Sequence, residues 1–386
     1  MEHPLLQSYG PLEGWHILLF IGLISIGFFT YQVQKATRLV MLGSSDDRFD
    51  SWSTRISEFI SGWLFQKKVL RDKVAGTMHV LMFWGFLMLA SDMLDLATAN
   101  AFSGKVLPAI LVGPWNGMVE LGYFMALVGC VSALTRRVVF TPEKLKGKSQ
   151  LEGNVILLLI FTITTTSFMV ESAESPSSFW EPLGYWFSEQ GLSEQTVILS
   201  YWAHMLAISV FLFLIPLSKH MHLVMAVPNV FFHDAGPIAR MRPLATGDDG
   251  KAVPLEDLDI DSFGVSTYNQ YSWRQLIDGW SCTSCARCQD VCPAYASGKG
   301  LNPMQVIHDV RNYANDHAPI LLSGGQPDET ILERITEEAV WACTTCNACV
   351  DVCPLYIEHV PKLTDLRRNA MMETMEYPEI LNTAMG

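Results

Sequence analysis

Long apolar runs separated by polar segments dominate the first 225 residues of this 386-residue chain. A helix needs about 20 predominantly apolar residues to cross a bilayer, and five runs approach or reach this length. The pattern therefore predicts five transmembrane helices, the last of which continues as helix to about Met225. The predicted spans are residues 15–33, 76–94, 112–134, 154–170 and 196–217.

The segment between the first two spans has a different pattern. In residues 46–75, large apolar residues recur at helical spacing, and the basic residues Lys67, Lys68 and Arg71 follow them. Such a segment is typical of a helix that lies in the membrane interface, although a plain loop is the alternative. The apolar positions are Trp52, Ile56, Phe59, Ile60, Trp63 and Leu64.

Basic residues are distributed unequally between the two sets of loops. Residues 34–75 and 135–153 together carry thirteen Lys and Arg, whereas the other three loops carry only Lys105. Cytoplasmic loops of membrane proteins hold the excess of positive charge. We therefore expect a multi-pass protein of the cell inner (cytoplasmic) membrane, with its N-terminus outside and its C-terminal domain in the cytoplasm.

The chain changes character after residue 225. Residues 226–386 carry 11 basic and 22 acidic residues, out of a net charge of -13 for the whole chain. This acidity argues against nucleic acid as a partner. It favours a partner with a basic docking patch, whose binding weakens with salt. Charged residues make up only 17% of the chain, against about 25% in typical soluble domains, so an ordinary soluble enzyme is a poor fit.

Four histidines lie in or beside the predicted spans, where ionisable residues are usually functional. His79 and His222 lie at the inner ends of the second and fifth spans, and His16 and His204 lie toward the outer ends of the first and fifth. On a continuous helix, His204 and His222 are five turns apart on one face, separated by about 27 Å. The depths predict two stacked b haems, an inner one on His79 and His222 and an outer one on His16 and His204. Histidines that form hydrogen bonds between helices are the alternative.

Two further polar residues lie inside the third span. Glu120 could relay protons for quinone chemistry, and a structural hydrogen bond explains it equally well. Cys130 is predicted to be a packing residue.

The other eight cysteines form two runs of identical spacing, C-x2-C-x2-C-x3-C-P, which begin at Cys282 and at Cys343. In two-cluster ferredoxins with this spacing, three thiolates of one run bind a 4Fe–4S cluster, and the fourth binds the other cluster. Zinc sites normally use paired ligands instead, and disulfides are rare in the cytoplasm. The predicted ligands are Cys282, Cys285, Cys288 and Cys353 for cluster 1, and Cys343, Cys346, Cys349 and Cys292 for cluster 2.

These patterns predict a mainly α fold, in which a five-helix transmembrane bundle precedes a cytoplasmic α-helical two-cluster ferredoxin-like domain. The expected division is a membrane domain at residues 1–225, an ordered linker at 226–271 and the ferredoxin-like domain at 272–386. Within the last domain we expect helices at 304–313 and 328–341, with a turn at 324–327.

The membrane half resembles the nitrate reductase gamma-subunit family of dihaem cytochromes b, in its topology and in the spacing of His204 and His222. The family's second-span histidine matches His79. A second histidine on that span would fall near Leu89, where this chain has none. The resemblance therefore implies a dihaem cytochrome b domain whose second haem uses His16 or is absent.

Five motifs are spread over nearly the whole chain, namely RFD (48–50) and residues 68–86, 218–232, 272–294 and 341–360. In these motifs the chain resembles fused cytochrome b/iron–sulfur proteins related to heterodisulfide reductase and to membrane electron-transfer-flavoprotein:quinone oxidoreductases. Longer members add a domain with CCG motifs, which this sequence lacks. We therefore expect the catalytic subunit to be a separate polypeptide, either CCG-bearing or a flavoprotein.

The resemblance implies a quinone-reactive oxidoreductase subunit of a respiratory complex. Electrons would pass between a cytoplasmic redox partner and a membrane quinone, expected to be menaquinone, through the two clusters and the haems. The alternative is a non-catalytic membrane anchor and electron relay, with the quinone chemistry on another subunit.

Overall fold

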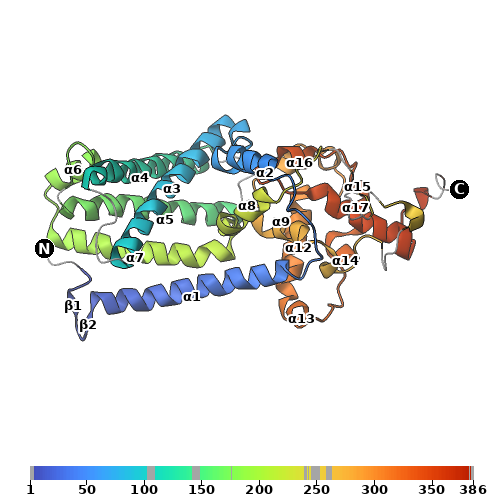
Figure 1. Ribbon diagram of the computed structural model, residues 1–386, viewed down its shortest axis with the longest axis horizontal. Coiled ribbons are helices and arrows are strands. Elements are labelled where there is room, and N and C mark those ends of the chain that lie inside the picture. Colours follow the sequence, from blue (N-terminus) through green and yellow to red (C-terminus); the bar gives the residue numbers. More distant parts are fainter. Residues whose placement is uncertain are drawn as a thin grey trace. The chain divides into compact units, whose positions relative to one another are not determined.

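The computed structural model is mainly α-helical (Figure 1). It describes residues 4–101, 109–140, 148–174, 176–238, 241, 243–244, 253–257, 263–381 and 383. Internal contacts divide the chain into two compact units. We call Met1–Thr30 with Val69–Ser218 the span unit, and Tyr31–Lys68 with Lys219–Gly386 the cysteine unit.

Among the described residues, five helices are long and apolar enough to cross a membrane. Each contains one of the predicted spans, so the prediction of five span-length apolar helices is confirmed. A short hairpin of β1 (Ser8–Tyr9) and β2 (Leu12–Glu13) precedes the first, and α6 (Pro182–Glu189) lies between the last two. The five are α1 (Gly14–Val40), α3 (Lys73–Ala101), α4 (Ala109–Val138), α5 (Lys148–Glu171) and α7 (Glu194–Leu217).

Small residues let the helices of the span unit approach closely. Helices α3, α4, α5 and α7 lie side by side (Figure 1). A Cβ atom on Gly85 of α3 would lie 2.7 Å from the carbonyl oxygen of Gly122 on α4, and one on Gly129 would lie 2.8 Å from that of Met78. Backbone contact through glycine is a common way to pack helices in lipid. It fixes the part of α3 that carries His79.

The fifth span ends earlier than predicted. Helix α7 stops at Leu217, and Ser218 is extended, with φ -124° and ψ 178°. A single 3-10 turn, Lys219–Met221, then leads into α8 (His222–Phe231). The expected continuation to Met225 is wrong, because Pro216 lacks the N–H of a helical hydrogen bond and the chain straightens just after it. His204 and His222 therefore do not lie on one continuous helix, and the five-turn argument does not apply to them.

The cysteine unit is built from short helices around one apolar core that includes Tyr268, Tyr271, Leu276 and Tyr313. The predicted helix at 304–313 is confirmed by α12. The predicted helix at 328–341 divides at Thr336, whose φ is 78°. Its described α-helices after residue 272 are α9 (Trp273–Ser281), α10 (Arg287–Asp290), α11 (Pro293–Ala296), α12 (Pro303–Asp316), α13 (Ala318–Leu322), α14 (Ile331–Ile335), α15 (Glu337–Ala342), α16 (Ala348–Val352) and α17 (His359–Asn369).

A network of buried charges joins distant segments of the cysteine unit. Arg274 and Asp278 of α9 are fully buried and form an ion pair of 2.8 Å, and Lys362 of α17 also donates to Asp278. Arg48, from the RFD motif, pairs with buried Glu358 at 3.1 Å. Buried charges are tolerated only when they are paired, so this network fixes α9 and α17 against each other.

The predicted interfacial segment is helical over Trp52–Leu64, as α2 (Trp52–Phe59) followed by a π-helical turn. Within this helical stretch Arg55 is buried and donates to the carbonyl oxygens of Phe231 and His233, at 3.4 and 2.7 Å. Trp52, Ile56 and Ile60 are exposed.

The predicted linker 226–271 is described only in part. Residues 239–240, 242, 245–252 and 258–262 lie outside the described residues. Residues 226–231 belong to α8, and the last part packs within the cysteine unit, where the Val265 N–H donates to the Asp365 carbonyl at 3.0 Å. The expected domain boundaries at 225 and 271 remain predictions.

Candidate metal centres

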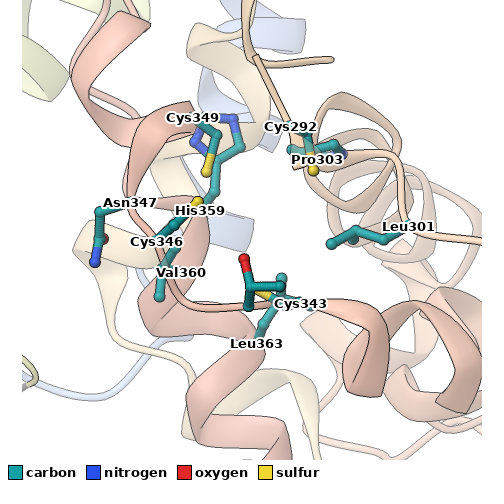
Figure 2. A pocket seen from close by; sticks show the side chains of 11 residues that line it. Cys292, Leu301, Pro303, Cys343, Cys346, Asn347, Cys349, His359, Val360 and Leu363 are labelled. Carbon is teal, nitrogen blue, oxygen red and sulfur yellow. The ribbon is translucent and has the colours of Figure 1, made fainter. Parts of the chain in front are cut away.

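The eight cysteines of the two runs line two small cavities in the cysteine unit. Each cavity takes three cysteines from one run and one from the other. The structure therefore brings together the two predicted ligand sets. Cavity 1 is lined by Cys282, Cys285, Cys288 and Cys353, and cavity 2 by Cys292, Cys343, Cys346 and Cys349 (Figure 2).

The two cysteine loops, loop 1 (282–288) and loop 2 (343–349), follow the same path. Cys282 ends α9 with φ -65° and ψ 123°, and Cys343 ends α15 with φ -68° and ψ 126°. The third and fifth residues of each loop are left-handed, with φ of 56° and 61° in loop 1 and of 53° and 59° in loop 2. These residues turn the chain, so that three thiols of each loop line one cavity.

The two cavities are close to each other. Cys288 from one set and Cys349 from the other lie in a single apolar cluster with Val360. Helices α10 and α16, which begin within the two loops, pack against each other. Pro293, after the fourth cysteine of the first run, begins α11, where its missing N–H is not needed.

The thiol arrangement fits a cluster better than a single ion. Tetrahedral zinc with Zn–S bonds near 2.3 Å would hold its sulfurs about 3.8 Å apart. Among the described residues, no three Cys, His, Asp or Glu side chains converge closely enough to bind one ion. The thiols instead surround a space whose other walls include Leu301, Pro303 and Leu363 at cavity 2 (Figure 2).

Burial makes these thiols poor anions on their own. It raises the pKa of Cys282 to about 11 and that of Cys353 to about 12. Each set contains at least two buried thiols, and neighbouring thiolates in such a site need positive charge among them, which bound iron would supply. The Thr345 N–H also donates to Cys343 Sγ at 3.4 Å, as backbone amides do around metal-bound sulfur.

The second cysteines of the two loops differ in exposure. Cys346 is exposed, whereas Cys285, at the same position of loop 1, is half-buried. An open groove contains Trp341, which directly precedes Ala342 and Cys343 in the chain. The sulfur-bearing side chain most accessible to a partner is therefore that of Cys346. The groove is lined by Lys299, Glu337, Glu338, Trp341, Ala342 and Pro378.

Two of the four predicted haem histidines have a suitable hydrogen-bond pattern. His204 Nδ1 lies 3.1 Å from the carbonyl oxygen of Ile163 on α5, and His222 Nδ1 lies 2.8 Å from that of Lys219. A carbonyl oxygen only accepts, so each Nδ1 carries the proton and each Nε2 has its lone pair. This is the usual arrangement of a metal-binding histidine.

The other two histidines are placed differently. The His16 ring is exposed and stacks on Trp15, and its Nδ1 accepts the Glu13 N–H at 3.2 Å. Accepting at Nδ1 leaves the proton of a neutral ring on Nε2, so this conformation does not offer Nε2 to iron. His79 lies on α3 in the span unit, and His222 lies in the cysteine unit. Both haem pairings remain predictions.

The two polar residues of the third span have structural partners. Buried Glu120 accepts the N–H groups of Leu183 and Gly184, both at 2.7 Å, at the start of α6. Cys130 is fully buried, and its thiol donates to the Leu157 carbonyl at 2.9 Å. The structural interpretation of Glu120 is thereby favoured, and Cys130 packs as predicted.

Residues 274–354 match the 4Fe-4S dicluster domain. This segment contains both cysteine runs, and it supports the prediction that the cysteine unit binds iron–sulfur clusters. The match covers the dicluster domain only. No solved structure matches the chain.

Curated relatives extend the similarity beyond the dicluster domain. The "EtfAB:quinone oxidoreductase" of Syntrophomonas wolfei is 28% identical over 406 residues, 94% of this chain and 55% of that protein. The "Probable iron-sulfur-binding oxidoreductase FadF" of Bacillus subtilis is 27% identical over 398 residues, 91% of this chain and 55% of that protein. This chain thus spans about half the length of these two relatives.

A third relative is similar over a shorter stretch. The "Probable membrane-anchored ferredoxin" of Chromohalobacter salexigens is 34% identical over 148 residues, 33% of this chain and 22% of that protein. Together the relatives are iron–sulfur redox proteins, and with the five apolar helices they support a membrane-anchored electron-transfer subunit. The resemblance to cytochromes b remains a prediction.

Three residues near the cavities of the dicluster domain were not predicted from the sequence. His308 Nε2 lies 3.6 Å from Cys282 Sγ and 3.1 Å from Ser284 Oγ. Arg367 donates to the backbone carbonyl of Cys343. His359 lines both cavities. Only tertiary packing brings these side chains to the cysteines, so the spacing of the motifs carries no signal for them.

Proposed function

We propose that this protein is the membrane electron-transfer subunit of a respiratory complex. It would pass electrons between a cytoplasmic redox partner and a membrane quinone, with menaquinone as the expected one. The observation that carries the proposal is the pair of four-thiol cavities in a chain that also has five span-length apolar helices. A quinone oxidoreductase among its relatives favours the quinone as the membrane substrate.

The cysteines would hold two 4Fe–4S clusters, each of which accepts and releases one electron when bound. Cys282, Cys285, Cys288 and Cys353 would bind cluster 1, and Cys343, Cys346, Cys349 and Cys292 would bind cluster 2. Cys288 of one set and Cys349 of the other share a buried apolar cluster with Val360. Electron transfer between two clusters requires that they lie close together with apolar side chains between them.

The cytoplasmic partner would dock beside loop 2. Cys346 is the exposed cysteine of the two sets, and the open groove is lined by Trp341 and Ala342, which directly precede loop 2. The partner would be a separate redox subunit, either CCG-bearing or a flavoprotein. Because residues 226–386 are strongly acidic, we expect its docking surface to be basic and its binding to weaken with salt.

The membrane helices would hold the haems. His222 would pair with His79 at the inner haem, and His204 would pair with His16 at the outer one, which requires the His16 ring to leave its hydrogen bond with the Glu13 N–H. The Nδ1 hydrogen bonds of His204 and His222 suit this role, because they leave Nε2 of each ring available to iron. The exposed apolar face of α2 would lie in the lipid interface, with the N-terminus outside and the dicluster domain in the cytoplasm.

The test uses the full-length chain, purified anaerobically from membranes with its co-purifying subunits. We expect about eight iron atoms per chain in the clusters, protohaem absorbance, and reduction of both cofactors by a short-chain menaquinol. Cys346→Ser should remove one cluster signal. Cys130→Ser should remove none, because Cys130 is the cysteine outside the two runs. Folded protein without cluster iron would refute the proposal. Clusters and haem that menaquinol cannot reduce would leave the chain a non-catalytic anchor and relay.

A further inference from the structure

His359 occupies a unique position among the described residues that line the two cavities. It is the first residue of α17, it is 1% exposed, and it contributes to the walls of both cavity 1 and cavity 2. In Figure 2 its ring lies beside Cys349. No other residue is shared by the two linings.

The orientation of the His359 ring is determined by its own loop. Nδ1 lies 3.1 Å from the carbonyl oxygen of Ile357, so Nδ1 carries the proton and donates it. The ring is therefore a fixed and polarisable group that borders two sites, each of which gains negative charge on reduction.

We propose that His359 is a positioning residue common to both 4Fe–4S clusters, which holds them at a fixed separation and sets the reduction potential of each. This inference rests on the proposed function, since it requires both clusters. Cluster potentials depend on the polarity and hydrogen bonding of the immediate surroundings. A side chain that forms a wall of both sites therefore acts on both potentials, whereas a side chain beside one site acts on one.

The experiment compares His359→Leu with His308→Leu in the full-length protein. His308 is the matched control, because it is a half-buried histidine beside Cys282 of cavity 1 only. Electron paramagnetic resonance during a dithionite titration gives both midpoint potentials and the magnetic interaction between the two reduced clusters. Cys346→Ser identifies which signal belongs to cluster 2.

We expect His359→Leu to shift both midpoint potentials and to change the interaction signal, and His308→Leu to shift cluster 1 alone. His359→Gln keeps a polar side chain that can donate to the Ile357 carbonyl, so it should return both potentials toward the wild-type values. Two intact clusters at unchanged potentials, or a shift in only one, would overturn the inference while leaving the proposed function in place.

Loss of clusters also decides the question. If His359→Leu assembles neither cluster while His359→Gln assembles both near the wild-type potentials, the side chain is required at both sites, as the inference expects; loss of only one cluster in His359→Leu would contradict it. A chain that loses its yield and its helical circular dichroism in both variants would make His359 a folding residue and contradict the inference. Absence of clusters from the wild-type protein is a different result, because it refutes the proposed function itself.

Discussion

Loop 1 and loop 2 have nearly the same backbone and different surroundings. Their first cysteines have φ and ψ within a few degrees of each other, and both loops are left-handed at the third and fifth residues. Loop 1, however, has His308 beside its first sulfur, whereas loop 2 has Arg367 on its first carbonyl. The comparison teaches that the repeated motif encodes how a cluster is bound, and that unrelated neighbours make the two sites unequal.

The helices that carry the loops are also anchored differently. Four residues before Cys282 stands Asp278, a buried carboxylate that two cations approach, and four residues before Cys343 stands Ala339, in the apolar core. Loop 1 is also covered by a distant segment, since Arg287 donates to the Lys68 carbonyl at 2.9 Å. Both preceding helices pack in the apolar core, and the helix before loop 1 adds a buried charge network at Asp278, whereas Cys346 of loop 2 is exposed.

The largest expected effect comes from removing the fourth cysteine of a run, which lines the cavity of the other loop. Cys292 follows loop 1 in sequence and lines cavity 2. We therefore expect Cys292→Ala to remove the same cluster signal as Cys346→Ser, and to reduce cluster iron from about eight to about four atoms per chain. Iron analysis and electron paramagnetic resonance of the reduced protein measure both quantities.

The reciprocal variant is Cys353→Ala, which should remove the signal that Cys285→Ser removes, because both residues line cavity 1. Cys130→Ser is the control with full iron content. If Cys292→Ala instead removed the cluster of loop 1, the two sets would not be interleaved and the assignment of cavities would be wrong.

The second effect concerns the anchoring of loop 1. Asp278→Asn would leave Arg274 and Lys362 buried with one carboxylate fewer, which we expect to cost about 3–5 kcal/mol of the free energy of unfolding. Cluster 1 should be lost at a lower urea concentration than cluster 2. Arg368→Ala removes a less buried pair with Asp365 and should cost less than about 1 kcal/mol. Equal urea midpoints for Asp278→Asn and the wild type would contradict this view of the network.

Much of this arrangement could be predicted from the sequence, because it depends on patterns of residues that are close together in the chain. The spacing of a run places three thiols on one loop, and hydropathy alone identifies a helix such as α5. The end of α7 at Ser218 could not be predicted, because a proline such as Pro216 either bends a helix or ends it according to its tertiary surroundings. His308 and Arg367 could not be predicted either, since each reaches a cysteine from another helix, 26 and 24 residues away in the chain.

The third effect is a change in the midpoint potential of one cluster and not of the other. Arg367 is a cation beside Cys343, so it stabilises the added electron of cluster 2. Arg367→Gln should lower the midpoint potential of cluster 2 by roughly 50–100 mV, which corresponds to about 1–2 kcal/mol for a one-electron couple. The potential of cluster 1 should change little. A dithionite titration measures both midpoint potentials. A larger change at cluster 1 would show that the charge of Arg367 does not act mainly on cluster 2.

The smallest expected effect lies in the backbone that the loops share. The left-handed fifth position is Ala286 in loop 1, with φ 61°, and Asn347 in loop 2, with φ 59°. A left-handed conformation costs roughly 1–2 kcal/mol for most residues, and asparagine and glycine tolerate it better. Ala286→Gly should therefore stabilise loop 1 and raise the urea concentration at which cluster 1 is lost. Asn347→Ala should destabilise loop 2 and lower the urea concentration at which cluster 2 is lost. Each change corresponds to about 1 kcal/mol of the free energy of unfolding. The Asn347 side chain also donates to the Thr345 carbonyl at 3.1 Å, so its loss adds to the backbone effect. Urea titration of cluster absorbance measures both variants, and Ala286→Gly at or below the wild-type midpoint would mean that loop 1 bears no strain at this position.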